Sequence, residues 1–195
     1  IKMMIEKFVE FNGEGIEVPY NLTYPLSKKD MSKALYLKYI NSPSRQGIAW
    51  VHDGKEIKIK DDKASIQGFP TTDMNYVVAV YLGLDGEFKP PRNAVIYNLD
   101  GSIRKVLEIP SFISDKLCKR LSFLEQENPP LSWAAYEGQL FFGGFGWYKK
   151  DDGKVVNFIS IVMERESFEQ RELDPQTGIF GECLGSGLAQ YARIE

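Results

Sequence analysis

The chain has 195 residues, of which 43% are hydrophobic and 26% are charged, as in an ordinary folded protein of one domain. Its net charge of −3 argues against a general nucleic-acid-binding role, because phosphate binding needs a concentrated basic surface. No apolar run is long enough for a membrane-spanning helix, so no membrane association is expected. We expect residues 1–195 to form a single domain.

The first forty residues predict a hairpin followed by a helix. Residues 1–24 alternate weakly between polar and apolar types and are interrupted by glycines, which is typical of two short paired strands. A helix is expected near 28–41, because Ser27 opens a segment that resembles a capping box and apolar residues follow at near-helical spacing. Pro43 ends this helix, since the residue before a proline avoids the helical conformation.

Four Asp-Gly pairs punctuate the chain, most of them with a strand-like run on both sides. Asp and Gly tolerate the positive φ that a two-residue hairpin turn demands, so the pairs predict antiparallel strands joined locally. The acids in these pairs are then expected at hairpin tips, in structural roles. The pairs are Asp53-Gly54, Asp85-Gly86, Asp100-Gly101 and Asp152-Gly153.

The remaining segments complete a mainly β pattern. Residues 76–84 are nearly all apolar, which predicts a strand buried on both faces. A second helix is expected near 114–127, where apolar residues follow Ser114 at helical spacing. The last third returns to strands from residue 133 onward, and glycines inside the run 141–148 predict a bulge.

These elements predict a mainly β (α+β) fold in which an antiparallel meander of hairpins carries two helices packed on the sheet. The meander is expected to curve into a barrel-like or two-sheet structure. A small or partial β-propeller is the alternative, because the strands recur at short intervals joined by tight turns.

Few residues offer catalytic or metal-binding chemistry. The single histidine, His52, argues against triads and zinc sites, and we expect it to be a solvated residue beside a turn. Cys118 and Cys183 match no metal spacing and predict small buried thiols in a cytoplasmic protein. We therefore expect neither a metal nor a cofactor.

Paired carboxylates could support hydrolysis of glycosides, where two acids flank the bond that breaks. Asp61-Asp62 and Asp151-Asp152 are such pairs, but they lie at expected turns beside lysines and are typical of solubilising residues. Gly185-Ser186-Gly187 has part of a nucleophile-elbow pattern without its flanking frame, so we expect a loop there.

Two surfaces are candidates for binding. Acids near the end of the chain could form either an ordinary exposed strand face or an acidic docking surface for a basic partner protein. These acids are Glu164, Glu166, Glu169, Glu172 and Asp174. Aromatic residues could instead line a site for a small molecule or glycan, and these are Trp133, Phe145, Trp147 and Tyr148.

Two segments carry a resemblance to a class of proteins. Residues 93–109 (NAVIYNLDGSIRKVLEI) and 171–187 (RELDPQTGIFGECLGSG), within a small acidic β meander, resemble small bacterial immunity proteins of contact-dependent or polymorphic toxin systems. The resemblance implies a non-enzymatic cytoplasmic protein that covers the active site of a cognate toxin, such as a basic nuclease. A β scaffold that binds a small molecule or glycan is the alternative, and an enzyme that uses carboxylates is a third hypothesis.

Overall fold

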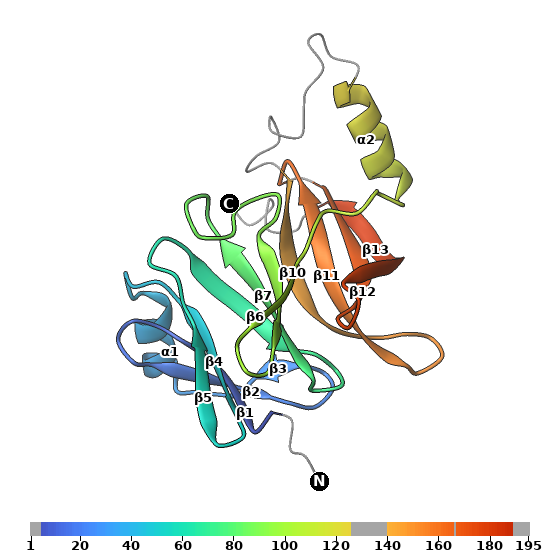
Figure 1. Cartoon of the computed structure of the whole chain (residues 1–195). Coiled ribbons are helices and arrows are strands. Elements are labelled where there is room, and N and C mark those ends of the chain that lie inside the picture. Colours follow the sequence, from blue (N-terminus) through green and yellow to red (C-terminus); the bar gives the residue numbers. More distant parts are fainter. Residues whose placement is uncertain (1–4, 126–139, 166, 189–195) are drawn as a thin grey trace.

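The computed structural model describes residues 5–125, 140–165 and 167–188, and Figure 1 shows their arrangement. Three antiparallel sheets follow one another in chain order and pack against each other in a row. The mainly β class with two helices and local antiparallel pairing is confirmed. The sheets number three, and within the described residues none of them closes into a barrel.

The first sheet contains the N-terminal hairpin and has the strand order β3-β2-β1-β4-β5. The hairpin expected within residues 1–24 is confirmed, and so is the turn at Asp53-Gly54, where both residues have positive φ. The strands are β1 (Lys7–Phe11), β2 (Glu17–Asn21), β3 (Ser27–Lys28), β4 (Gly47–His52) and β5 (Lys55–Ile59).

The central sheet is buried on both faces. Alternate residues of β7 point into different cores, so that Val78 packs toward the third sheet and Val77 toward the first. This confirms the doubly buried strand expected from the apolar run 76–84. Its strands, in spatial order, are β6 (Ser65–Pro70), β7 (Tyr76–Leu82), β8 (Ala94–Asn98) and β9 (Ile103–Val106).

The third sheet holds the longest strands. The expected bulge is confirmed, since the register of β10 against β11 shifts between Phe142 and Phe145. The prediction of a loop at Gly185-Ser186-Gly187 is wrong, because these residues pair with β12 inside a continuous strand. The strands are β10 (Leu140–Lys149), β11 (Val155–Met163), β12 (Ser167–Asp174) and β13 (Ile179–Leu188).

Three of the four Asp-Gly pairs close hairpins, and the fourth does not. Asp85-Gly86 lies in the long connection between β7 and β8. This connection is held by Asp61, whose Oδ2 accepts the amide of Glu87 at 2.8 Å. The turns at Asp100 and Asp152 are held by their own carboxylates, each of which accepts the amide two residues further on.

Two helices accompany the sheets. Helix α1 (Lys33–Ile40) starts later than the expected residue 28, because its N-cap is Ser32 and Ser27 belongs to β3. Helix α2 (Asp115–Glu125) confirms the second expected helix, whose last expected residues lie outside the described part of the chain. Figure 1 shows α1 beside the first sheet and α2 at the opposite end of the molecule, beyond the third sheet.

Candidate functional site

The central acid of the expected acidic surface is buried. Glu169 has no exposed area, and its carboxylate accepts the amides of Ser114 at 2.7 Å and Ile113 at 3.1 Å. Arg171, 5% exposed, donates to the same carboxylate at 2.9 Å and to the carbonyl of Ser111. Glu169 therefore fixes the start of α2 on the third sheet and does not contribute to a docking surface.

The other acids of this set are separated and already engaged. Glu164 forms a two-bond ion pair with Arg120 of α2, with both distances 2.8 Å. Glu172 lies 3.4 Å from Lys150, and Asp174 accepts the amide of Gln176 within its own turn. Glu166 lies outside the described residues. The structure thus does not assemble these acids into one free acidic face.

The aromatic candidates do not share a surface either. Phe145 stacks on Phe69 with ring centroids 5.1 Å apart, and the indole nitrogen of Trp147 donates to the carbonyl of Pro70 at 2.9 Å. Both side chains pack between the third and central sheets. Tyr148 is the next residue along β10 and lies on the other face, while Trp133 is outside the described residues.

The remaining sequence candidates have structural roles. The imidazole of His52 lies beside the turn, 3.3 Å from the Asp53 carboxylate, but at 13% exposure it is not solvated as expected. Cys118 and Cys183 are free thiols and only partly buried. Among the described residues, no group of three or more His, Cys, Asp or Glu is arranged to hold a metal ion.

Helix α1, expected to pack on the sheet, carries a group of exposed apolar side chains. Of its eight residues only Tyr39 is buried. Tyr36, Leu37 and Ile40 are 45%, 41% and 46% exposed, and at about 100° per residue they fall on one side of the helix. Leu35 is 40% exposed and lies on the opposite side. We call these three residues the α1 stripe. Helix position alone does not distinguish this side from the buried one, because KALYLKYI is apolar around most of its circumference.

A buried carboxylate holds α1 in place. Glu10 of β1 is 1% exposed and accepts the hydroxyl of Tyr39 at 3.1 Å and that of Tyr20 at 2.7 Å. The ammonium of Lys28 lies 3.0 Å from the same carboxylate. Because these contacts fix the buried side of α1, they also fix the side that faces outward.

The surroundings of the α1 stripe are basic. Between residues 28 and 38 the chain has four basic residues and one acidic residue, although its overall net charge is −3. Lys33 falls within the angular range of the stripe, three residues before Tyr36 and four before Leu37. An exposed apolar stripe that includes one lysine within its angular range is therefore the main candidate surface in the described residues.

Comparison with protein-family models, curated proteins and solved structures found no match for this chain. No helix in the described residues is long and apolar enough to cross a membrane.

Proposed function

We propose that this chain is a non-enzymatic protein-binding protein whose contact surface is the α1 stripe. The exposure of Tyr36, Leu37 and Ile40 on one side of a fixed helix carries this proposal. Apolar side chains gathered on a surface are typical of interaction sites, and an aromatic residue with two aliphatic neighbours can serve as a binding anchor. The stripe is too short to give a membrane much apolar area, which favours a protein partner.

Charge selects the kind of partner. Lys33 and Lys38 lie on α1, and Lys29 precedes it, so a partner with an acidic surface around an apolar pocket complements this region. A second copy of the chain is a poor partner, because pairing two α1 helices brings like charges together. We therefore commit to a different protein with an acidic contact surface.

The non-enzymatic part of the proposal is supported by Asp61 and Asp152, acids from the two adjacent pairs, whose carboxylates hold turns. Asp61 accepts the amides of Lys63 and Glu87, and Asp152 accepts the amide of Lys154. Carboxylates that hold turns in this way are not arranged around a shared substrate. The resemblance of residues 93–109 and 171–187 to immunity proteins supports the more specific proposal that the partner is a toxin domain and that binding covers its active site. The basic residues near α1 favour a toxin with an acidic contact surface over the basic nuclease expected from the sequence.

The test compares two variants in binding assays. Leu37→Ser/Ile40→Ser removes the two aliphatic side chains of the α1 stripe, and Ile179→Ser makes the same kind of change at a side chain that is 64% exposed on the third sheet. A partner is first recovered from extracts of cells that naturally make the protein, then purified and titrated against each form. We expect the stripe variant to weaken binding by about 100-fold and the control to bind as wild type.

Two further experiments, charge reversal and binding to lipid vesicles, can contradict the proposal. Lys33→Glu should also weaken binding, and the loss should shrink at high salt. Equal binding by the wild type and the stripe variant contradicts the proposal, and so does stripe-dependent binding to vesicles of anionic lipid without a protein partner. If the partner is a toxin, co-expression of this protein should protect cells from a toxin encoded beside it. Cells that the toxin still kills during co-expression contradict this more specific proposal.

A further inference from the structure

A groove on the outer face of the first sheet has features of a small-molecule site. Its volume is about 410 Å³, within the range of pockets that hold small ligands. The floor is formed by Val9 and Ala49, register partners on β1 and β4 whose exposures are 3% and 2%. The walls are the β1–β2 hairpin, the loop after α1 and the segment that follows β5. We call it the Phe11 groove.

The ring of Phe11 is the central aromatic surface of the groove. A Cβ built on Gly47 would lie 2.6 Å from Phe11 Cζ, so the ring lies directly against the backbone of β4 where only glycine leaves room. The ring is half-buried, and the ammonium of Lys58 lies 5.3 Å from its centroid. A flat ligand ring can stack at such a surface.

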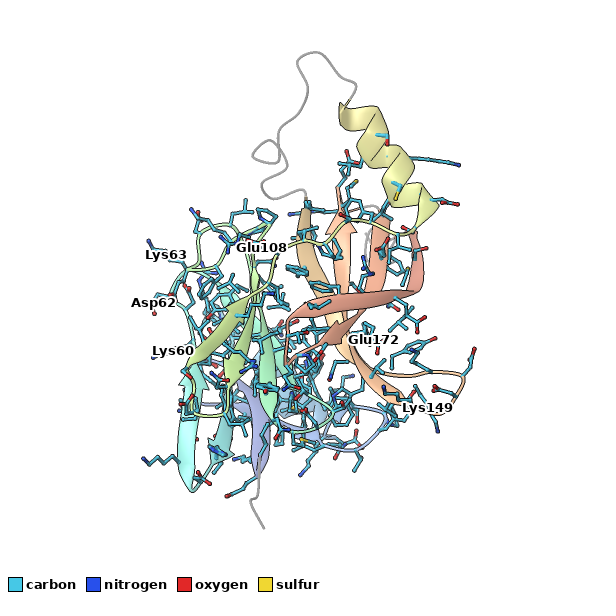
Figure 2. All side chains as sticks on the ribbon, turned by 45° about the vertical axis from the view of Figure 1, so that its right-hand side comes forward. Lys60, Asp62, Lys63, Glu108, Lys149 and Glu172 are labelled. Atoms are coloured by element: carbon cyan, nitrogen blue, oxygen red, sulfur yellow. The ribbon has the colours of Figure 1, made fainter. Side chains whose placement is uncertain are left out.

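The rim of the groove carries three cations and three acids, and two of the acids, Glu17 and Asp61, are engaged elsewhere. Among the cations, Lys58 also lies 3.4 Å from the carboxylate of Glu56. Glu17 pairs with Lys7 at 3.0 Å, and the Asp61 carboxylate accepts two backbone amides. Arg45 donates its Nε to the carbonyl of Asp62 at 2.9 Å, which holds the guanidinium at the rim, and Lys60 follows β5 there. Figure 2 shows Lys60 and Asp62 on the same side of the molecule, away from Lys149 and Glu172.

The backbone amides of the neighbouring hairpin are not available to a ligand. The amides of Glu14 and Ile16 donate to the side chain of Asn12, and the amide of Gly13 donates to Ser44 Oγ at 2.8 Å. Recognition of an anion in the groove therefore depends on the side chains of Arg45, Lys58 and Lys60.

We infer that the Phe11 groove binds a small organic anion that joins a flat ring to a carboxylate or phosphate group. The ring of the ligand packs against the part of Phe11 that neither Lys58 nor the β4 backbone covers, and the anionic group pairs with the cations of the rim. This site is separate from the α1 stripe and does not depend on the protein-binding proposal.

The test is a titration followed by amide NMR spectra of the whole chain. The probes are naphthoate, adenosine monophosphate and the neutral analogue naphthol, so that the first two distinguish a carboxylate from a phosphate source. At least one of the anions should saturate and shift amides of residues 11–17, 44–47 and 58–62. Naphthol should bind about tenfold more weakly than naphthoate, because it lacks the charge.

Two double variants test whether the affinity for the anion depends on the cations of the rim. Arg45→Ala/Lys60→Ala should weaken binding of the anion by about tenfold or more. Lys149→Ala/Lys154→Ala removes two lysines at a distant turn and should leave the affinity unchanged (Figure 2). The inference is overturned if neither anion gives saturable shifts in the groove, if naphthol binds as well as naphthoate, or if the rim variant keeps the wild-type affinity.

Discussion

Glu10 illustrates how one buried acid positions a whole helix. Its carboxylate receives two tyrosine hydroxyls and an ammonium, which replaces the water that an ionised group loses on burial. Tyr39 is the single buried residue of α1, so its hydroxyl links the helix to the first sheet.

Removing that hydroxyl should loosen the helix and destabilise the fold. Tyr39→Phe leaves Glu10 with one donor fewer, and we expect the free energy of unfolding to fall by about 1.5 to 3 kcal/mol. The control is Tyr36→Phe, an equal change on an exposed ring of the same helix, which should stay within about 0.5 kcal/mol of wild type. Urea denaturation measures both, and equal stabilities for the two variants contradict this role of Glu10.

Glu169 has the corresponding role at α2. Glu169→Gln leaves Arg171 buried without its counterion, and we expect a loss of about 3 kcal/mol in unfolding free energy. Glu172→Gln removes an acid from a partly exposed pair with Lys150, and its cost should be about 1 kcal/mol or less. If the two substitutions cost the same in urea denaturation, Glu169 does not hold α2 as described.

The burial of Glu169 also predicts how the stability of the fold changes at low pH. Burial by itself raises the pKa of Glu169, but hydrogen bonds from Ser114, Ile113 and Arg171 outweigh it and hold the pKa below the usual 4.5. Its stabilising effect is therefore present above pH 4.5 and is lost as pH falls through the lower folded-state pKa. Below pH 4.5 the stability of wild type should decline more steeply than that of Glu169→Gln, and parallel declines contradict the prediction.

At the scale of elements, Gly68 shows why strand β6 is not predicted from the sequence. Strand β6 has a glycine in its middle and ends at Pro70, and both residues are typical of loops. In the structure β6 lies so close to β7 that a Cβ on Gly68 would be 2.5 Å from the carbonyl oxygen of Val78. The glycine permits this approach between strands and does not interrupt the sheet.

The prediction for this strand compares two alanine substitutions. Gly68→Ala must displace backbone and should cost about 2 to 3 kcal/mol in unfolding free energy. Gly144→Ala adds the same methyl group where its nearest neighbour is 3.7 Å away, and it should change stability by less than about 1 kcal/mol. Thermal unfolding distinguishes the two, and an unchanged melting temperature for Gly68→Ala contradicts the close approach.

The elements predicted correctly depend on short stretches of sequence. The turn at Asp53-Gly54 and the doubly buried strand within 76–84 follow from residue types that act locally. The burial of Glu169 could not be predicted, because its hydrogen-bond partners Ser114 and Ile113 lie more than fifty residues earlier in the chain. Similarly, the outward side of α1 is set by the contact of Tyr39 with Glu10, which no helical pattern contains.

At the scale of the whole molecule, buried tyrosines form hydrogen bonds in two places, on Glu10 of the first sheet and between two strands of the central sheet. Burial raises the pKa of each of four tyrosines above 10, and the charge of Glu10 adds to this for two of them. They are Tyr20, Tyr39, Tyr81 and Tyr97. The hydroxyls of Tyr81 and Tyr97 lie 2.5 Å apart inside the core.

These tyrosines should make the fold sensitive to alkali. Since their folded-state pKa values exceed 10, their contribution is complete below pH 10 and is lost as pH rises beyond it. Absorbance of tyrosinate should rise in two steps, with the second step coinciding with loss of the β-sheet circular dichroism signal. If all ten tyrosines ionise together while the sheet signal persists, the buried tyrosines do not stabilise the fold as described.

The central functional claim is that the α1 stripe meets an acidic protein partner. Hydrogen exchange of the chain with and without the purified partner tests this most directly, because it locates the contact on the molecule. We predict that binding slows exchange in residues 28–45 and leaves β12 and β13 unchanged. Protection confined to the third sheet, with α1 exchanging as in the free protein, would contradict the claim.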